Sequence, residues 1–223
     1  MNFLSHYYYT QSTTNPYYTL GAVLPDLFRN HHHEWKFHEI DIVPDDEDMT
    51  WLLKGWLLHI EVDRIFHSST PFADHTSHLR KKLVHVFTQP PKRPFFLAHI
   101  GYELILDALL IQSKYLDAHQ FYQQLSKCDA TVLDRFMTQL GIQNTEGFHK
   151  FLKSFIDSRY LVGYNRPKSL VYAMDQIGRR VWVEKFTEFE TRNAMEAVDS
   201  TMKELDPAFI DVFHWVEKRL HLV

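Results

Sequence analysis

The stretch Gly55-Trp-Leu-Leu-His59-Ile-Glu-Val-Asp63-Arg-Ile-Phe-His67 is a mostly apolar segment that carries three side chains able to bind a metal ion. His59, Asp63 and His67 are spaced four residues apart, and each step of four advances only about 40° around an α-helix. All three therefore point to one side of the predicted helix. Helices of the His-Glu-x-x-His type present two ligands to zinc in the same way.

A second segment, Ala98-His99-Ile-Gly-Tyr-Glu103-Leu-Ile-Leu-Asp107, repeats this spacing with His99, Glu103 and Asp107. Charged side chains are rarely buried unless they are paired or bound to a metal, and both triplets lie among large apolar residues. We therefore predict that the two helices face each other across a metal site. With 15 histidines and 28 acidic residues in 223, however, such triplets also arise by chance. Two solvated helix faces therefore remain an alternative.

The composition predicts an all-α protein, a helical bundle with a single domain over residues 1–223. The chain has only 7 glycines, and its periodic stretches are long, which argues against a many-turned β fold. Pro25 is expected to kink or break the helix in which it lies. The predicted helices cover residues 17–30, 49–67, 72–88, 95–113, 116–126, 129–140, 145–160, 167–180, 184–204 and 207–220.

Charge and cysteine content narrow the class of function. A net charge of −4 indicates no nucleic-acid partner. The single cysteine, Cys128, suits a reducing cytoplasm. No apolar run reaches the roughly 18 residues of a membrane span, and the first residues do not form a secretory signal, so we expect a cytoplasmic protein.

The absence of other catalytic motifs favours metal-assisted chemistry if the protein is an enzyme. The chain has no glycine-rich phosphate loop, no dinucleotide-binding fingerprint and no Gly-x-Ser-x-Gly nucleophile turn. Imidazole and carboxylate ligands without a thiolate suit Mn, Fe, Zn or Mg.

Several short motifs, taken in order, make the chain resemble the acyl carrier protein phosphodiesterase family, a divergent relative of the HD-domain phosphohydrolases. The similar segments are Met1-Asn-Phe-Leu-Ser-His6, Gly21-Ala-Val-Leu-Pro-Asp26-Leu-Phe-Arg29, His59-Ile-Glu-Val-Asp63, Glu103-Leu-Ile-Leu-Asp107, Tyr160-Leu-Val-Gly-Tyr164 and Gly178-Arg179-Arg180.

The resemblance implies an HD-domain-like all-α fold and a phosphodiesterase that uses a divalent cation, Mn or Mg first, with Fe or Zn as alternatives. Its substrate would be the phosphodiester that joins 4′-phosphopantetheine to a serine of acyl carrier protein. Such a hydrolysis needs the charge on the phosphate oxygens to be neutralised and a water molecule to be activated, and a bound metal can do both.

The residues that match the family motifs receive roles from the resemblance. Asp63 or Glu103 would orient ligands or act as the base, and His67 and His99 are further candidate ligands. The exposed cationic end of a helix explains Arg179 and Arg180 equally well. The implied metal ligands are His6, Asp26, His59 and Asp107, and the implied phosphate-binding residues are Arg29, Arg179 and Arg180.

Two departures from the family pattern keep alternatives open. Ile60 and Glu61 replace a pair of arginines, and Ala108 replaces a histidine. One alternative is a helical binding protein of the same fold without catalysis. The other is a phosphohydrolase that acts on a different small phosphoester. The sequence predicts no particular oligomeric state.

Overall fold

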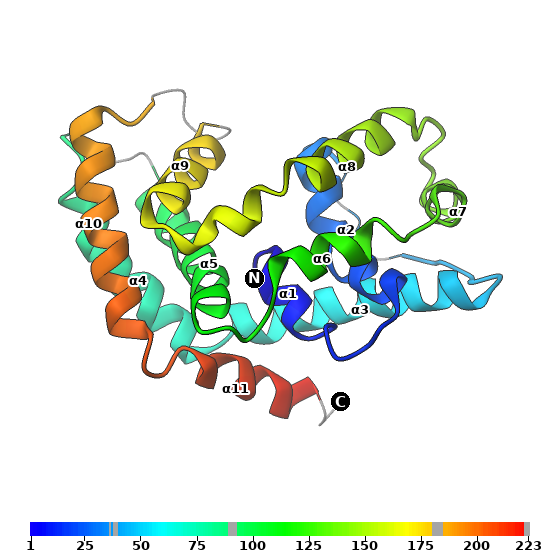
Figure 1. The fold of residues 1–223 in the computed structure, drawn as a ribbon, viewed down its shortest axis with the longest axis horizontal. Helices are drawn as coiled ribbons and strands as arrows, with labels where there is room; N and C mark the ends of the chain where they lie inside the picture. The colour runs from blue at the N-terminus through cyan, green and yellow to red at the C-terminus, as the bar shows by residue number, and fades with distance from the viewer. Residues whose placement is uncertain (36, 38–39, 89–92, 180–184, 221–223) are drawn as a thin grey trace. The chain divides into compact units, whose positions relative to one another are not determined.

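The predicted all-α class is confirmed by the structure, a computed structural model that describes residues 1–35, 37, 40–88, 93–179 and 185–220. Over these ranges the chain forms eleven α-helices and one 3-10 helix, and no strand. The predicted helices all occur, with ends that differ by a few residues from those expected (Figure 1). The likeness to HD-domain proteins stays a prediction.

Two compact units, each built from two segments of the chain, make up the fold. Unit 1 comprises Met1–Asp63 and Leu116–Val162, and unit 2 comprises Arg64–Tyr115 and Gly163–Val223. The long helix α3 (Glu47–His67) contributes residues to both units. A single domain over residues 1–223 stays a prediction.

Unit 1 is organised around α2, whose buried face packs against α1, α6 and α8 (Figure 1). Leu20, Leu24 and Phe28 on this face are fully buried. Since α1 contacts both α2 and α6, the aromatic start of the chain packs into the core of this unit. The helices of this unit other than α3 are α1 (Phe3–Tyr8), α2 (Pro16–His31), α6 (Ala118–Leu125), α7 (Ala130–Gln139) and α8 (Glu146–Ser158).

Two glycines let α2 and α3 touch backbone to backbone. A Cβ atom added at Gly21 would lie 2.1 Å from the Leu52 carbonyl oxygen, and one added at Gly55 would lie 2.3 Å from that of Tyr18. Only residues without a side chain fit such a crossing. The crossing matters for function because it brings the carbonyl groups of α2 next to the histidine that follows Gly55 by one turn.

The chain stays helical through Pro25, so the alternative of a helix break is wrong. Proline removes one backbone N–H and crowds the carbonyl four residues earlier, which here belongs to Gly21. The helix persists because residues on both sides of the proline are buried in unit 1.

Gly141 ends α7 in the manner expected of a glycine after a helix. Its φ is +84°, its N–H donates to the Thr138 carbonyl at 2.9 Å, and the N–H of Ile142 donates to the Met137 carbonyl at 3.0 Å. These two bonds form the Schellman motif, in which the left-handed residue is usually glycine. The predicted helix end at Gly141 is confirmed.

Unit 2 has α5 as its central helix. This helix packs against α4, α9 and α10, and twelve of its nineteen residues are buried. Pro94 occupies the first turn, as the sequence predicts. The helices of unit 2 are α4 (Thr70–Val84), α5 (Pro94–Gln112), α9 (Pro167–Gly178), α10 (Glu188–Leu205) and α11 (Ile210–Leu220), while the 3-10 helix η1 (Tyr160–Asn165) lies at the boundary with unit 1.

Among the described residues, α5 is the one helix long and apolar enough to cross a membrane by length and composition. Its polar side chains His99, Glu103 and Asp107 interrupt the apolar run. The fold buries 67% of the most apolar stretch of α5, as is typical of a core helix in a globular protein.

Glu190 ties the start of α10 to the segment that follows α4. Its carboxylate accepts hydrogen bonds from the backbone N–H and hydroxyl of Thr187 at 2.9 Å each, and from those of Thr88 at 3.3 and 3.1 Å. Thr187 and Glu190 form a complete capping box. Burial by itself would raise the pKa of Glu190, but the hydrogen bonds from both threonines hold it below its ordinary value.

Replacing Glu190 by glutamine is expected to lower the free energy of unfolding by about 1–3 kcal/mol at pH 7, because a buried charged acceptor is lost. A carboxyl whose folded-state pKa is lowered stabilises the protein above its unfolded pKa, here near 4.5, and loses that effect as the pH falls through the folded value. Urea unfolding at pH 7 and pH 3.5 should therefore show the difference between the two proteins shrinking in acid. A difference that is equal at both pH values would contradict this role.

Candidate metal centre

His59 lies on the buried side of α3, one turn after the crossing with α2. Its Nδ1 is 2.8 Å from the Ala22 carbonyl oxygen. A carbonyl oxygen can only accept a hydrogen bond, so Nδ1 donates to it, and Nε2 is the ring nitrogen that faces Asp63. Histidine ligands of metal ions are commonly oriented by such a bond through the other ring nitrogen. The crossing of α2 and α3 thus fixes the orientation of the His59 ring.

His6, from α1, stacks on His59 with ring centroids 3.9 Å apart. The His6 side chain is 1% exposed, and among the described residues neither of its ring nitrogens has a partner that gives a hydrogen bond of good geometry. Burial, together with the neighbouring His59, lowers the pKa of His6 to about 3. His6 is therefore neutral at physiological pH, which is the protonation state that a metal ligand needs.

Asp63 supplies a carboxylate to both rings. Its Oδ1 is 3.3 Å from Nε2 of His6, and its Oδ2 is 3.7 Å from Nε2 of His59. The amino group of Met1 lies 2.5 Å from Oδ1. Burial alone would raise the pKa of Asp63, but the amino group and the two histidines hold it well below its usual range. The carboxylate is thus ionised and already faces a cation.

These three residues form what we call cluster 1, a group that could hold a divalent ion. One ligand atom from each lies within 4.8 Å of the others. Ligands bonded to a tetrahedral metal at about 2.1 Å are separated by roughly 3.3 Å, close to the 3.3 and 3.7 Å between the nitrogens and the carboxylate here. Buried imidazole nitrogens without good hydrogen bonds are uncommon, and a metal ion would satisfy them. Two imidazoles and one carboxylate suit Mn, Fe or Zn.

A second group, cluster 2, comprises His67, His99 and Glu103 and lies in unit 2. Each imidazole Nε2 is 3.0 Å from Oε1 of Glu103. The predicted neighbours His99 and Glu103, four residues apart on α5, do interact. The sequence groups His67 with His59 by spacing, whereas the contacts assign it to cluster 2.

The remaining predicted site residues belong to neither cluster. Asp26 is half-buried in α2, and Asp107 is fully buried in α5. Arg29 is exposed in the last turn of α2. Arg179 forms an ion pair with Asp175 at 3.0 Å, whereas Arg180 lies outside the described residues. Their metal-binding and phosphate-binding roles stay predictions.

The sequence does not predict two of the groups that contact cluster 1, the Ala22 carbonyl and the amino group of Met1. The Ala22 carbonyl is a backbone group, so no residue type signals its role. The amino group of Met1 reaches Asp63 across 62 positions of sequence, and no spacing rule covers such a distance. The sequence signal nearest to both is the pair Gly21 and Gly55, since glycines within helices often mark close packing of backbones.

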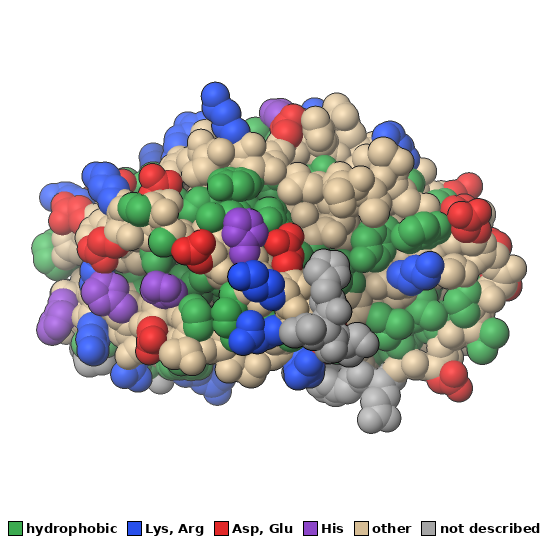
Figure 2. All heavy atoms as spheres, turned by 90° about the horizontal axis from the view of Figure 1, so that it is seen from below, with side chains coloured by type: hydrophobic (Ala, Val, Ile, Leu, Met, Phe, Trp, Pro, Cys, Tyr) green, Lys and Arg blue, Asp and Glu red, His purple; other side chains and the backbone are tan. Residues whose placement is uncertain are grey.

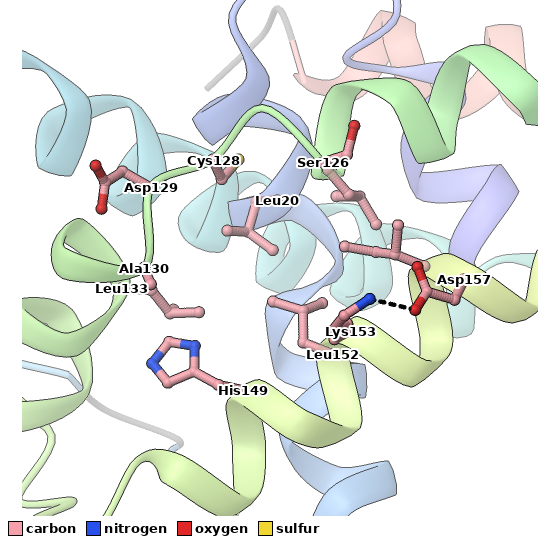
Figure 3. Close-up of a pocket in the computed structure, with 12 residues that line it drawn as sticks. Leu20, Ser126, Cys128, Asp129, Ala130, Leu133, His149, Leu152, Lys153 and Asp157 are labelled. Carbon is pink, nitrogen blue, oxygen red and sulfur yellow. Dashed lines mark hydrogen bonds and ion pairs between the residues drawn. The ribbon is translucent and has the colours of Figure 1, made fainter.

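A separate cavity of about 270 Å³ opens in unit 1 between α6, α7 and α8 (Figure 3). His149 and Cys128 line it, and Lys153 and Asp157 form an ion pair of 2.5 Å at its rim. Burial raises the pKa of the Cys128 thiol to about 12, so this cysteine is not an activated nucleophile. No residue of either cluster lines this cavity.

The face of the molecule drawn in Figure 2 carries acidic, basic and histidine side chains that intermix. This face therefore has no electrostatic field of a single sign.

Comparison with protein-family models, curated proteins and solved structures gives no match to this chain. The class of protein is therefore defined by the fold and the side chains alone. Over the described residues, it is an all-α protein with two clusters of two histidines and one carboxylate, one in each unit.

Proposed function

We propose that this protein is a divalent-metal-dependent phosphodiesterase whose metal is held by cluster 1. The observation that carries the proposal is the buried pair His6 and His59 around Asp63, in which His6 has no good hydrogen bond and His59 is oriented by Ala22. A bound divalent ion would neutralise phosphate oxygens and lower the pKa of a water molecule. The resemblance implies Mn or Mg first, with Fe or Zn as alternatives, and the two imidazoles of cluster 1 favour Mn over Mg.

The residues of cluster 1 would divide the work between them. Nε2 of His6 and Nε2 of His59 would bind the ion. Asp63 is 28% exposed, so it faces the side from which a substrate can approach, and its carboxylate would orient the ligands or accept a proton from water. Arg29 is exposed on α2 and would pair with a phosphate oxygen through its guanidinium group.

The proposed substrate is the phosphodiester between 4′-phosphopantetheine and a serine of acyl carrier protein, in a cytoplasmic setting. Its support is the resemblance of six motifs, two of which supply all three residues of cluster 1. His6 closes the opening motif, and His59 with Asp63 forms the third. The agreement between motif and geometry is specific, because His6 is 53 residues away from His59.

A direct test measures release of phosphopantetheine from holo acyl carrier protein, with and without added Mn²⁺. We expect release that depends on Mn²⁺ and is lost in His59→Ala. His119→Ala is the control, because His119 is an exposed histidine of the same unit outside cluster 1. Hydrolysis of bis-p-nitrophenyl phosphate without release of phosphopantetheine would instead identify a phosphohydrolase for another small phosphoester.

One observation favours a second candidate, a helical binding protein without catalysis. The amino group of Met1 already supplies a positive charge to Asp63, and an incoming metal would have to compete with it. The replacement of the family's arginine pair by Ile60 and Glu61 points the same way. Metal analysis of the purified protein separates the two candidates. Absence of metal binding at cluster 1, together with no hydrolysis of either substrate, would support the second one.

A further inference from the structure

Cluster 2 is built from the end of one helix and one turn of another. His67 is the last residue of α3, and His99 and Glu103 lie one turn apart on α5. Both imidazole Nε2 atoms converge on the same oxygen, Oε1 of Glu103, at 3.0 Å each. The two rings are 4.9 Å apart between centroids. Three potential ligand atoms therefore already surround one point.

The surroundings hold these side chains in place while leaving them accessible. Phe72 is buried, and its ring lies 5.0 Å from that of His67 and 4.9 Å from that of His99, so it forms an apolar wall against both. The side chains of His67, His99 and Glu103 are 32%, 29% and 14% exposed, which leaves a path for an ion from solvent. Ligands held on packed helices keep their geometry better than ligands on loops.

The distances match those of a metal site. Ligand atoms around tetrahedral zinc are roughly 3.3 Å apart, so each nitrogen needs to move away from Glu103 Oε1 by only a few tenths of an ångström. Two imidazoles and one carboxylate, with a fourth position toward solvent, form the ligand set of open zinc sites. A purely structural role needs only one histidine for each glutamate. Glu204 elsewhere in unit 2 is an example: its carboxylate contacts one histidine, His78, at 2.9 Å, and its other partners are Lys82 and Ser200.

We propose that His67, His99 and Glu103 form a second metal site, which binds a first-row divalent transition-metal ion such as Zn²⁺. Nitrogen-rich sites favour such ions over Mg²⁺ and Ca²⁺, which prefer all-oxygen ligands. The inference goes beyond the proposed function. It names a different set of ligand residues and requires no hydrolysis.

The test is the stoichiometry of Zn²⁺ bound in equilibrium dialysis of the full chain. Wild-type protein is compared with His67→Ala, His99→Ala and Glu103→Gln for cluster 2, with His6→Ala for cluster 1, and with His78→Ala as the matched control. Loss of one direct ligand should weaken binding by more than the roughly 10- to 100-fold that loss of an outer-shell partner causes. We expect each cluster 2 variant to lose one ion per chain, while His78→Ala loses none.

The variants also separate this site from the proposed function. If wild-type protein binds two ions, and His6→Ala and His99→Ala each lose one, both sites are real. If wild-type protein binds one ion that is lost in His99→Ala but retained in His6→Ala, cluster 2 is a metal site and the metal-binding premise of the proposed function fails. If all three cluster 2 variants bind as much Zn²⁺ as wild type, the second site is overturned.

A spectroscopic measurement distinguishes loss of a metal ligand from loss of the fold. Co²⁺ can replace Zn²⁺, and its visible absorption reports nitrogen and oxygen ligands in a tetrahedral site. Wild-type protein should show this absorption, and Zn²⁺ should displace it. Glu103→Gln, which keeps the size of the side chain, should lose the cluster 2 part of the absorption while its far-ultraviolet circular dichroism stays helical. A Glu103→Gln protein that folds and keeps the full absorption would overturn the site.

Discussion

Replacing Gly55 by alanine is expected to lower the free energy of unfolding by about 3 kcal/mol, a large part of the roughly 5–15 kcal/mol that holds a typical protein together. The added Cβ would lie 2.3 Å from the Tyr18 carbonyl oxygen, 2.7 Å from the Ala22 nitrogen and 2.9 Å from the Gly21 Cα. All three are backbone atoms, so no side-chain rotation can relieve the overlap. Alanine is the better helix former by about 1 kcal/mol, but that gain is smaller than the cost.

The same substitution should weaken metal binding at cluster 1. If α2 and α3 separate, the Ala22 carbonyl moves away from Nδ1 of His59, and the ring loses the bond that orients it. Urea unfolding followed by circular dichroism measures the stability, and dialysis against Mn²⁺ measures the binding.

Gly147→Ala is the matched control for this experiment. Gly147 lies in α8, and a Cβ there would meet only ring atoms of His31 at 3.6 Å, an ordinary contact. Because alanine also favours a helix, the control should gain about 0.5 kcal/mol. Equal unfolding midpoints for Gly55→Ala and wild type would contradict the close crossing of the two helices.

Replacing Asp63 by asparagine is expected to have the largest effect on activity. The carboxylate faces the two imidazoles, and asparagine keeps its size while removing its charge. A catalytic metal typically contributes several kcal/mol to transition-state stabilisation, so we expect phosphodiester hydrolysis to fall by about 1,000-fold or more. Affinity for Mn²⁺ should fall in parallel. The measurements are kcat/KM for phosphopantetheine release and the Kd for Mn²⁺.

Asp134→Asn provides the control for this prediction. Asp134 is also paired with a histidine in unit 1, His149 at 2.6 Å, but within the described part of the chain it belongs to no group of three potential metal ligands. The control should keep the Kd for Mn²⁺ and the hydrolysis rate of the wild type. An Asp63→Asn protein that hydrolyses at the wild-type rate with added Mn²⁺ would remove the basis of the proposed function.

Helix geometry explains why spacing alone does not assign the ligands. Residues at positions 59, 63 and 67 share one side of α3, as predicted, but each residue rises about 1.5 Å along the axis, so His59 and His67 are about 12 Å apart in that direction. Atoms that bind one ion must lie within a few ångströms of one another. His59 therefore pairs with His6, and His67 pairs with His99, with Asp63 and Glu103 as the respective carboxylates.

The sequence by itself determined the helical class, the ends of many helices and the candidate ligand types, because these depend on local periodicity, on capping residues such as Gly141 and on the chemistry of single side chains. Only the tertiary structure decided which ligands meet. His6 reaches His59 because α1 packs on α2 and because Gly21 and Gly55 let α2 approach α3. Contacts between residues far apart in the chain depend on how helices pack, and no local pattern encodes them.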